Sequence, residues 1–135
     1  MGDVIRRVSI TFTAGLVGGL ANRLAIWIFG ITGVTGALGV QFAPPLNVTF
    51  VYPGLIWGGI WGLIFLIPLM RERWVIRGFV YSILPSLVML LVIFPFRMDQ
   101  GMWGVQLGAL MPVMVFFFNA IWGIVAAGWC RVSGE

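Results

Sequence analysis

The stretch YPGLIWGGIWGLIFLIPLM, from Tyr52 to Met70, decides the fold of this chain. It contains no ionisable side chain except the tyrosine phenol, and the basic segment RERWVIR follows it at once, with Arg71, Arg73 and Arg77. An apolar run of about 20 residues is long enough to cross a bilayer as a helix. Arginines directly after such a run are typical of the cytoplasmic end of a transmembrane helix. The stretch therefore predicts a membrane span that ends in the cytoplasm.

The composition indicates that lipid surrounds much of the chain. Of its 135 residues, 61% are hydrophobic and only 9% are charged. A soluble domain of this size leaves roughly a third of its surface in water, and so few polar residues cannot cover that area. The eight basic residues are all arginine, the net charge is only +4, and the arginines form no single stripe. Nucleic-acid binding is therefore not expected.

Missing residue types limit the chemistry that the chain can carry. The chain has no histidine, which removes the usual general base, haem ligand and metal ligand. Cys130 is the single cysteine, so neither an internal disulfide nor a thiolate metal cluster is expected. We therefore expect no cofactor and no metal site.

Three more apolar runs complete a prediction of four spans. We expect an all-α, integral membrane four-helix bundle in one domain, residues 1–135, with spans at about 8–29, 52–70, 74–96 and 104–130. Pro112 is expected inside the fourth span. In an alternative, the first span is Leu24–Phe42 and Arg23 is cytoplasmic. That alternative forces four glycines into a helix, each at a cost of about 1 kcal/mol relative to alanine, so we prefer 8–29.

The arginines also predict the orientation of the spans. Six of them fall on one side of the membrane, and Arg97, beside Asp99, falls on the other. Because arginine is concentrated in cytoplasmic loops, we expect both termini in the cytoplasm. The expected location is a bacterial inner membrane, either the plasma membrane or an intracytoplasmic membrane, which the chain crosses several times. The topology anchors are Arg6, Arg7, Arg71, Arg73, Arg77 and Arg131.

The segment between the first two spans, residues 31–51, carries no charge. A structureless loop of this length is unusual in a compact protein. We therefore expect a short interfacial or re-entrant helix in this apolar outer loop. An extended turn at Pro44 and Pro45 should follow it and lead into the second span.

Glycines at four-residue spacing predict how the first two spans pack. Gly15 and Gly19 share one face of the first span. The corresponding face of the second span carries Gly54, Gly58 and Gly62. Faces of small residues let helix backbones approach closely in lipid. We therefore expect these five glycines to be helix-packing positions.

Arg23 is the one charge predicted within the membrane. It lies on the glycine face, about 9 Å along the helix from Phe29, and should face another helix rather than lipid. Its expected hydrogen-bond acceptors are the Gly108 carbonyl, freed by Pro112, and the side chain of Gln106. This interpretation makes Arg23 structural. The alternative is that Arg23 belongs to an anion or lipid-headgroup site in the outer half of the membrane.

Asn119, within FFFNAIWG, is the second polar side chain predicted inside the bundle. An amide in lipid seeks a partner across a helix interface. Asn22, or a carbonyl freed by a proline, is the expected partner. The candidate residues of an anion or lipid site are therefore Arg23, Gln106 and Asn119.

The predicted spans contain no carboxylate, and no general base accompanies the serines. Ion-coupled transport usually needs an intramembrane acid, and a serine nucleophile needs a base. Neither such transport nor catalysis is therefore expected. The leading hypothesis is a non-catalytic accessory or assembly subunit, with the lipid bilayer and other membrane subunits or a second copy as partners. The alternatives are a small dimeric channel or permease for an anion or neutral solute, with Arg23 in its site, and a lipid-handling protein.

Overall fold

The computed structural model describes residues 2–134 of the chain, and most of them are helical. Helix accounts for 79% of the structure, and the described residues form no strand. Four helical segments are long and apolar enough to cross a membrane: Gly2–Ile31, Val48–Leu66, Trp74–Arg97 and Met111–Val132. These segments confirm the prediction of an all-α protein with four candidate spans.

Several spans continue from an α-helix into a differently wound helical turn. In chain order the elements are α1 (Gly2–Ile31), α2 (Val34–Ala37), α3 (Val48–Gly62), the 3-10 turn η1 (Leu63–Leu66), α4 (Trp74–Val88), the π-helical η2 (Met89–Arg97), the 3-10 segment η3 (Met102–Leu107) and α5 (Met111–Val132).

The start of α3 has a sequence signal that the predicted boundary missed. The Asn47 side chain caps this helix by accepting a hydrogen bond from the Phe50 N–H at 2.9 Å.

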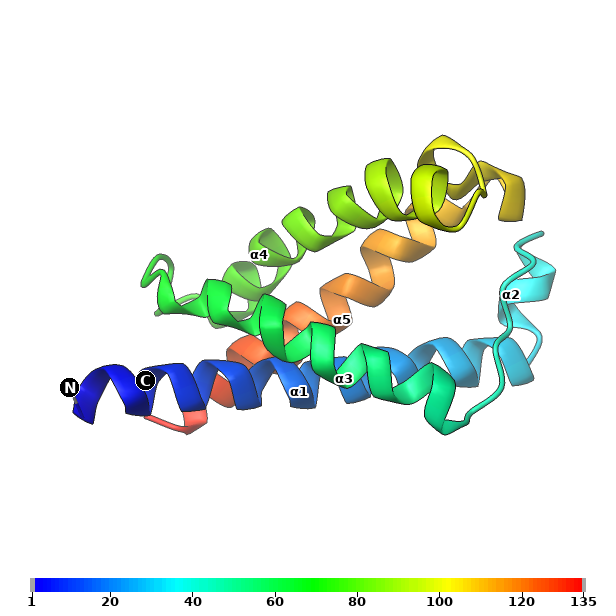
Figure 1. Ribbon diagram of the computed structural model, residues 1–135. Helices are drawn as coiled ribbons and strands as arrows, with labels where there is room; N and C mark the ends of the chain where they lie inside the picture. The colour runs from blue at the N-terminus through cyan, green and yellow to red at the C-terminus, as the bar shows by residue number, and fades with distance from the viewer. Residues whose placement is uncertain (1, 135) are drawn as a thin grey trace.

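The helices form two arms that meet at one end (Figure 1). Helix α1 packs along α3 and crosses α5, and α4 packs along α5. Among residues 2–134, α3 and α4 share no comparable contact, and the two helices diverge toward the end of the molecule that holds α2. The two ends of the chain lie together at the opposite end (Figure 1). Three helix–helix interfaces are therefore packed, α1–α3, α1–α5 and α4–α5, which we call packed seams. The gap between α3 and α4 is the open seam.

Glycines bring the α1 and α3 backbones together. Gly15 faces Gly58 and Gly62, and Gly19 faces the carbonyl of Gly54. A Cβ atom on Gly58 would lie 2.7 Å from the Gly15 carbonyl oxygen, closer than real side chains come. Small residues at such a crossing let the two backbones make extensive van der Waals contact in lipid.

A second glycine contact, between α4 and α5, was not predicted. Gly78 and Gly123 face each other, and a Cβ atom on Gly78 would lie 2.6 Å from the Cα of Ile124. Small residues repeat at four-residue spacing on both faces, as Gly78, Ser82 and Ser86 on α4 and as Gly123 and Ala127 on α5. The α4–α5 contact therefore left a repeat of small residues in the sequence, which a search for repeated glycines alone did not find.

The fourth span begins later than the sequence suggested, at Met111 instead of Gly104. The positive φ angles of Trp103 (66°), Gly104 (68°) and Gly108 (153°) prevent a continuous helix through this segment. Pro112 consequently lies in the first turn of α5, where its missing N–H does no harm. Pro112 therefore lies within the fourth span, as predicted, but in its first turn and not in its interior.

The second span is also displaced from its predicted limits. It begins at Val48 and its last helical turn ends at Leu66, so Met70 lies in the following turn with a φ angle of 59°.

Between α1 and α3, the four-residue helix α2 is followed by an irregular segment. That segment is tied to η3 by a hydrogen bond from the Gln41 N–H to the Leu107 carbonyl at 2.7 Å. The membrane position of α2 stays a prediction.

Candidate functional site

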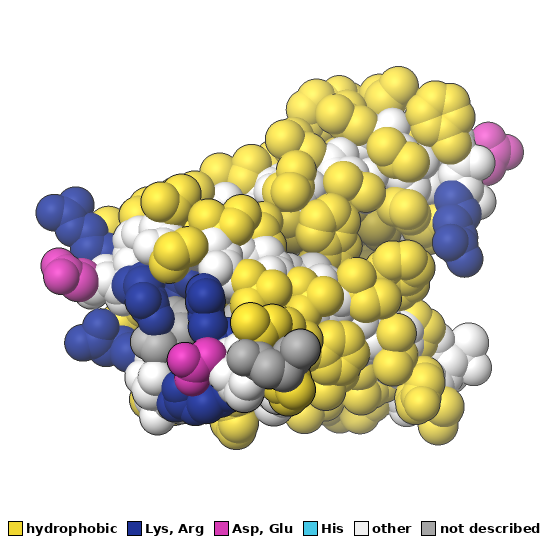
Figure 2. All heavy atoms as spheres, turned by 60° about the vertical axis from the view of Figure 1, so that its left-hand side comes forward, with side chains coloured by type: hydrophobic (Ala, Val, Ile, Leu, Met, Phe, Trp, Pro, Cys, Tyr) yellow, Lys and Arg dark blue, Asp and Glu magenta, His cyan; other side chains and the backbone are white. Residues whose placement is uncertain are grey.

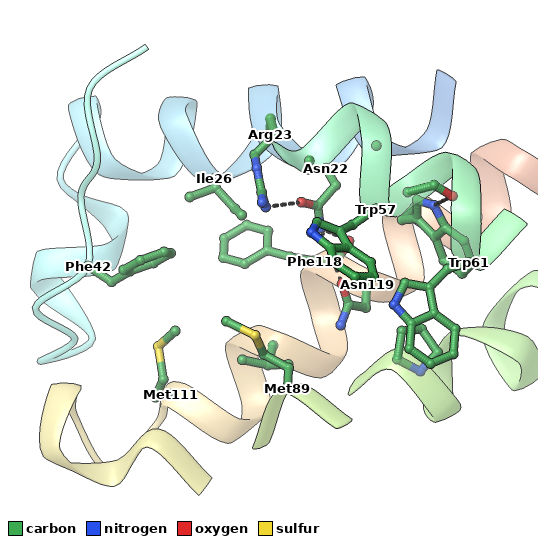
Figure 3. Close-up of a pocket in the computed structure, with 16 residues that line it drawn as sticks. Asn22, Arg23, Ile26, Phe42, Trp57, Trp61, Met89, Met111, Phe118 and Asn119 are labelled. Atoms are coloured by element: carbon green, nitrogen blue, oxygen red, sulfur yellow. Dashed lines mark hydrogen bonds between the residues drawn. The ribbon is translucent and has the colours of Figure 1, made fainter. Parts of the chain in front are cut away.

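A cavity of about 170 Å³ lies where the two arms of the molecule separate (Figure 3). Residues of α3 form one wall, Pro85 of α4 and Met89 of η2 form the other, and residues of α1 and α5 close the inner side. Trp57 is 55% exposed although it lines the cavity, so it stands at the mouth. The complete lining is Gly19, Asn22, Arg23, Ile26, Phe42, Gly54, Trp57, Gly58, Trp61, Pro85, Met89, Met111, Val115, Phe118, Asn119 and Trp122.

Arg23 is the one charged residue in this lining. Its aliphatic stem crosses α3 at Gly54, where a Cβ atom would lie 2.6 Å from the Arg23 Cγ. The glycine therefore leaves the space through which the arginine reaches the cavity (Figure 3). The Arg23 Nε donates to the Phe50 carbonyl at 3.0 Å, and Nη1 donates to the Asn22 Oδ1 at 3.0 Å. The guanidinium carbon also lies 5.0 Å from the centre of the Phe50 ring, within cation–π range.

The acceptors predicted for Arg23 were wrong. Gln106 lies on η3, is exposed and does not line the cavity. The Gly108 carbonyl accepts a hydrogen bond from the Met111 N–H at 3.1 Å, because the chain turns here before α5 begins. Arg23 donates to Phe50 and Asn22 in place of these two groups.

A chain of hydrogen bonds runs from Arg23 across the inner side of the cavity. The Asn22 Nδ2 donates to the Phe118 carbonyl at 2.9 Å and to the Asn119 Oδ1 at 3.4 Å. Asn22 was one of the two partners expected for Asn119. The Asn119 Nδ2 then donates to the Ser86 Oγ at 3.1 Å, and the Ser86 hydroxyl donates to the Ser82 carbonyl at 2.8 Å.

The direction of these bonds stabilises a positive charge on Arg23. Each group from Asn22 to Ser86 accepts a bond from the side of Arg23 and donates to the next group in the chain. The negative ends of the amide and hydroxyl dipoles therefore face the guanidinium. Sequence reasoning missed Ser82 and Ser86 because it considered them only as nucleophiles. Their four-residue spacing, which puts both on one face of α4, was the available signal.

Arg77 occupies a different kind of site at the opposite end of the molecule. It is only 2% exposed, and its Nη2 donates to the Phe65 carbonyl at 2.7 Å and to the Ile67 carbonyl at 3.0 Å. Its guanidinium carbon lies 5.1 Å from the centre of the Phe65 ring and 5.4 Å from that of Tyr81. Arg77 thus fills its site with carbonyl and ring contacts.

Arg7 completes the cap over the end of α3 and η1. Its Nη2 donates to the Leu66 carbonyl at 2.7 Å, beside the two carbonyls that Arg77 binds. The last carbonyls of a helix lack intrahelical donors and carry partial negative charge, which cations stabilise. Sequence reasoning treated Arg7 and Arg77 only as topology anchors, because the end of α3 approaches them only in the folded molecule.

The remaining predicted anchors are exposed. They gather at the end of the molecule where the chain begins and ends, and hydrophobic side chains cover the adjoining surface (Figure 2). These residues are Arg6, Arg71, Arg73 and Arg131. Arg6 also donates to the Gly134 carbonyl at 3.3 Å, which joins the first turns of α1 to the end of the chain.

No protein-family model, curated protein or solved structure matches this chain. The geometry of the cavity is therefore the basis for interpreting its function. Within residues 2–134, no group of three or more His, Cys, Asp and Glu side chains comes together at a possible metal site. The cavity instead offers a cation, two amides and aromatic walls, which is a set suited to binding.

Proposed function

We propose that this chain is a non-catalytic accessory or assembly subunit of a larger membrane complex. The observation that carries the proposal is the open seam between α3 and α4, beside three packed seams in the same molecule. Trp57 stands at the mouth of this seam with more than half of its surface exposed. A transmembrane helix of a partner that lies across the mouth would bury this tryptophan and close the bundle, because close packing stabilises helix association in lipid.

The contents of the cavity favour binding over catalysis. The guanidinium of Arg23 stays charged at any physiological pH and does not act as a general base. The amides of Asn22 and Asn119 neither accept nor release protons in this range. The Ser86 hydroxyl accepts a hydrogen bond from the Asn119 amide and donates one to the Ser82 carbonyl. Neither group is a base that could activate the hydroxyl as a nucleophile.

We further propose that the protein crosses a bacterial inner membrane with both termini in the cytoplasm. The gathering of exposed arginines at one end of the molecule supports this orientation (Figure 2). Single cysteines placed at Arg73 and Arg97, in a chain with Cys130 replaced, should react with impermeant reagents from opposite sides of the membrane. Labelling of both from the same side would overturn the orientation.

Photo-crosslinking in native membranes tests the subunit proposal. A photoreactive residue at Trp57 should attach to one stoichiometric membrane protein, which mass spectrometry and reciprocal purification then identify. The same residue at Leu20 is the control, because Leu20 is exposed on α1 at a similar depth, next to the Gly19–Gly54 contact. Equal crosslinking from both positions, or from neither, would contradict a docking face at α3 and α4.

An anion channel or permease is the second candidate, and Arg23 in the cavity is the observation that favours it. Conduction requires a path through the membrane, which two copies together would have to form. Purified protein in liposomes should then pass an anion, and Arg23→Gln should stop the flux without unfolding the chain. A homodimer that conducts and has no other protein partner would replace the subunit proposal.

A further inference from the structure

The charge of Arg23 has no counter-charge of its own chain in the cavity. None of the residues that line the cavity is an aspartate or glutamate. Asp3 lies in the first turn of α1, about 30 Å along the helix from Arg23 at 1.5 Å per residue. Glu72 and Asp99 lie in turns at the ends of helices, and Glu135 is outside the described residues. The aligned amides of Asn22 and Asn119 reduce the cost of this charge but do not neutralise it.

An ionisable side chain at this depth needs partners that stabilise its charge. Charges within membranes are costly, face the interior or a cavity, and pair with one another or with backbone carbonyls. Two of the five N–H groups of Arg23 are used by Phe50 and Asn22. The guanidinium also borders the cavity, so an acidic group there would form a charge-assisted hydrogen bond in a low-dielectric setting.

The dimensions of the cavity fit a side chain. An apolar protein cavity of about 150 Å³ holds a benzene molecule, and this cavity measures about 170 Å³. It therefore has room for the carboxylate end of a glutamate or aspartate side chain and not for a whole helix. Such a side chain would enter between α3 and α4, past Trp57, from a helix that lies outside the mouth.

We propose that the partner's transmembrane helix carries an aspartate or glutamate that enters the cavity and pairs with Arg23. This inference rests on the proposed subunit function and names the chemistry of the docking contact. A second copy of the chain does not supply the carboxylate from its described residues, because Asp3, Glu72 and Asp99 lie at helix ends and in the segments between helices. A lipid headgroup is disfavoured because Arg23 lies eight residues, about 12 Å, inside the end of α1, whereas headgroups lie outside the hydrocarbon core.

The test uses the complete chain and the partner identified by crosslinking from Trp57. Arg23→Gln is expected to lower the amount of partner recovered from native membranes by about tenfold or more, because it leaves a buried carboxylate unpaired. Neutralising the acidic residue in the crosslinked partner helix should cause a similar loss. The two neutral variants combined should be no worse than either alone, because neither then leaves an unpaired charge. Arg97→Gln, which changes an exposed arginine, is the matched control.

The partner-side variant protects the test from misfolding of this chain, because it leaves Arg23 and its bond to Phe50 intact. Undiminished recovery after the partner's acid is neutralised would overturn the inference. A crosslinked helix without an acidic residue would also overturn it, although docking at α3 and α4 would stand. If native mass spectrometry instead found phosphatidylglycerol bound to the wild type and lost in Arg23→Gln, the site would belong to a lipid. If no protein were crosslinked from Trp57, the proposed function itself would fail.

Discussion

The molecule places two arginines in different surroundings, one enclosed near the end that holds both termini and the other half-buried beside the cavity. At the end where the chain begins and terminates, Arg77 is 2% exposed, lies against the rings of Phe65 and Tyr81, and donates to carbonyls at the end of η1. At the other end, Arg23 is bonded to Phe50 and Asn22 but borders a cavity. An arginine whose surroundings are filled by acceptors and rings stabilises the folded chain. An arginine that borders a cavity can also bind a ligand or a partner.

The largest expected effect comes from removing the enclosed arginine. Arg77→Met should lower the free energy of unfolding by about 3–5 kcal/mol, because two carbonyls lose hydrogen bonds from a charged donor worth about 1.5–3 kcal/mol each. Tryptophan fluorescence during a detergent denaturation series would measure the change. Arg73→Met, at an exposed position four residues earlier, is the control and should change stability by less than about 0.5 kcal/mol. Equal losses in both variants would show that Arg77 does not cap η1.

The packed seam between α1 and α3 should respond next most strongly. Gly58→Ala places a Cβ atom 2.7 Å from the Gly15 carbonyl oxygen and is expected to cost about 1–3 kcal/mol by overpacking. The same denaturation series measures it. Gly36→Ala is the matched control, since nothing lies within 4 Å of a Cβ atom there. If the two alanine variants were equally stable, the close approach of the two backbones would not contribute to folding.

A smaller loss of stability is expected when the arginine at the cavity is removed. Arg23→Met should cost about 1–2 kcal/mol, because its two hydrogen bonds lie in a partly open site where other donors can reach the freed acceptors. The variant should stay folded, as judged by circular dichroism, and lose its partner. A destabilisation as large as that of Arg77→Met would remove the distinction between the two arginines.

The smallest effect should come from the hydrogen-bond chain behind Arg23. Asn119→Ala breaks the bonds to Asn22 and Ser86 and is expected to cost about 1 kcal/mol, because one polar contact between membrane helices typically contributes about 0.6 kcal/mol. Thermal unfolding in detergent would measure it, with Ala120→Gly as a control for helix propensity at the neighbouring position. A loss of several kcal/mol would mean that the amides, and not the glycine seams, hold α5 in place.

The sequence predicted some parts of the site and not others, for identifiable reasons. Glycine spacing marked Gly54, but only the folded molecule shows that the Arg23 stem passes over it. The Asn22–Asn119 pair was within reach of prediction, because buried amides in apolar helices need partners. The error over Gly108 and Gln106 came from the predicted start of the fourth span. Hydropathy cannot detect the positive φ angles of Trp103 and Gly104 that interrupt the helix.

The sequence by itself determined that this is a helical protein with four candidate spans. Apolar segments of this length leave their backbone groups no water to bind, and a helix satisfies those groups within the segment. Tertiary structure decided which arginine is enclosed and which faces a cavity. The local sequence suggested the reverse, because Arg77 follows the basic cluster at Arg71 and Arg73 whereas Arg23 lies within an apolar span. The hydrogen-bond partner that distinguishes each arginine belongs to another helical element. Arg23 binds the carbonyl of Phe50, and Arg77 binds the carbonyl of Phe65. The periodicity of a single helix does not predict such contacts.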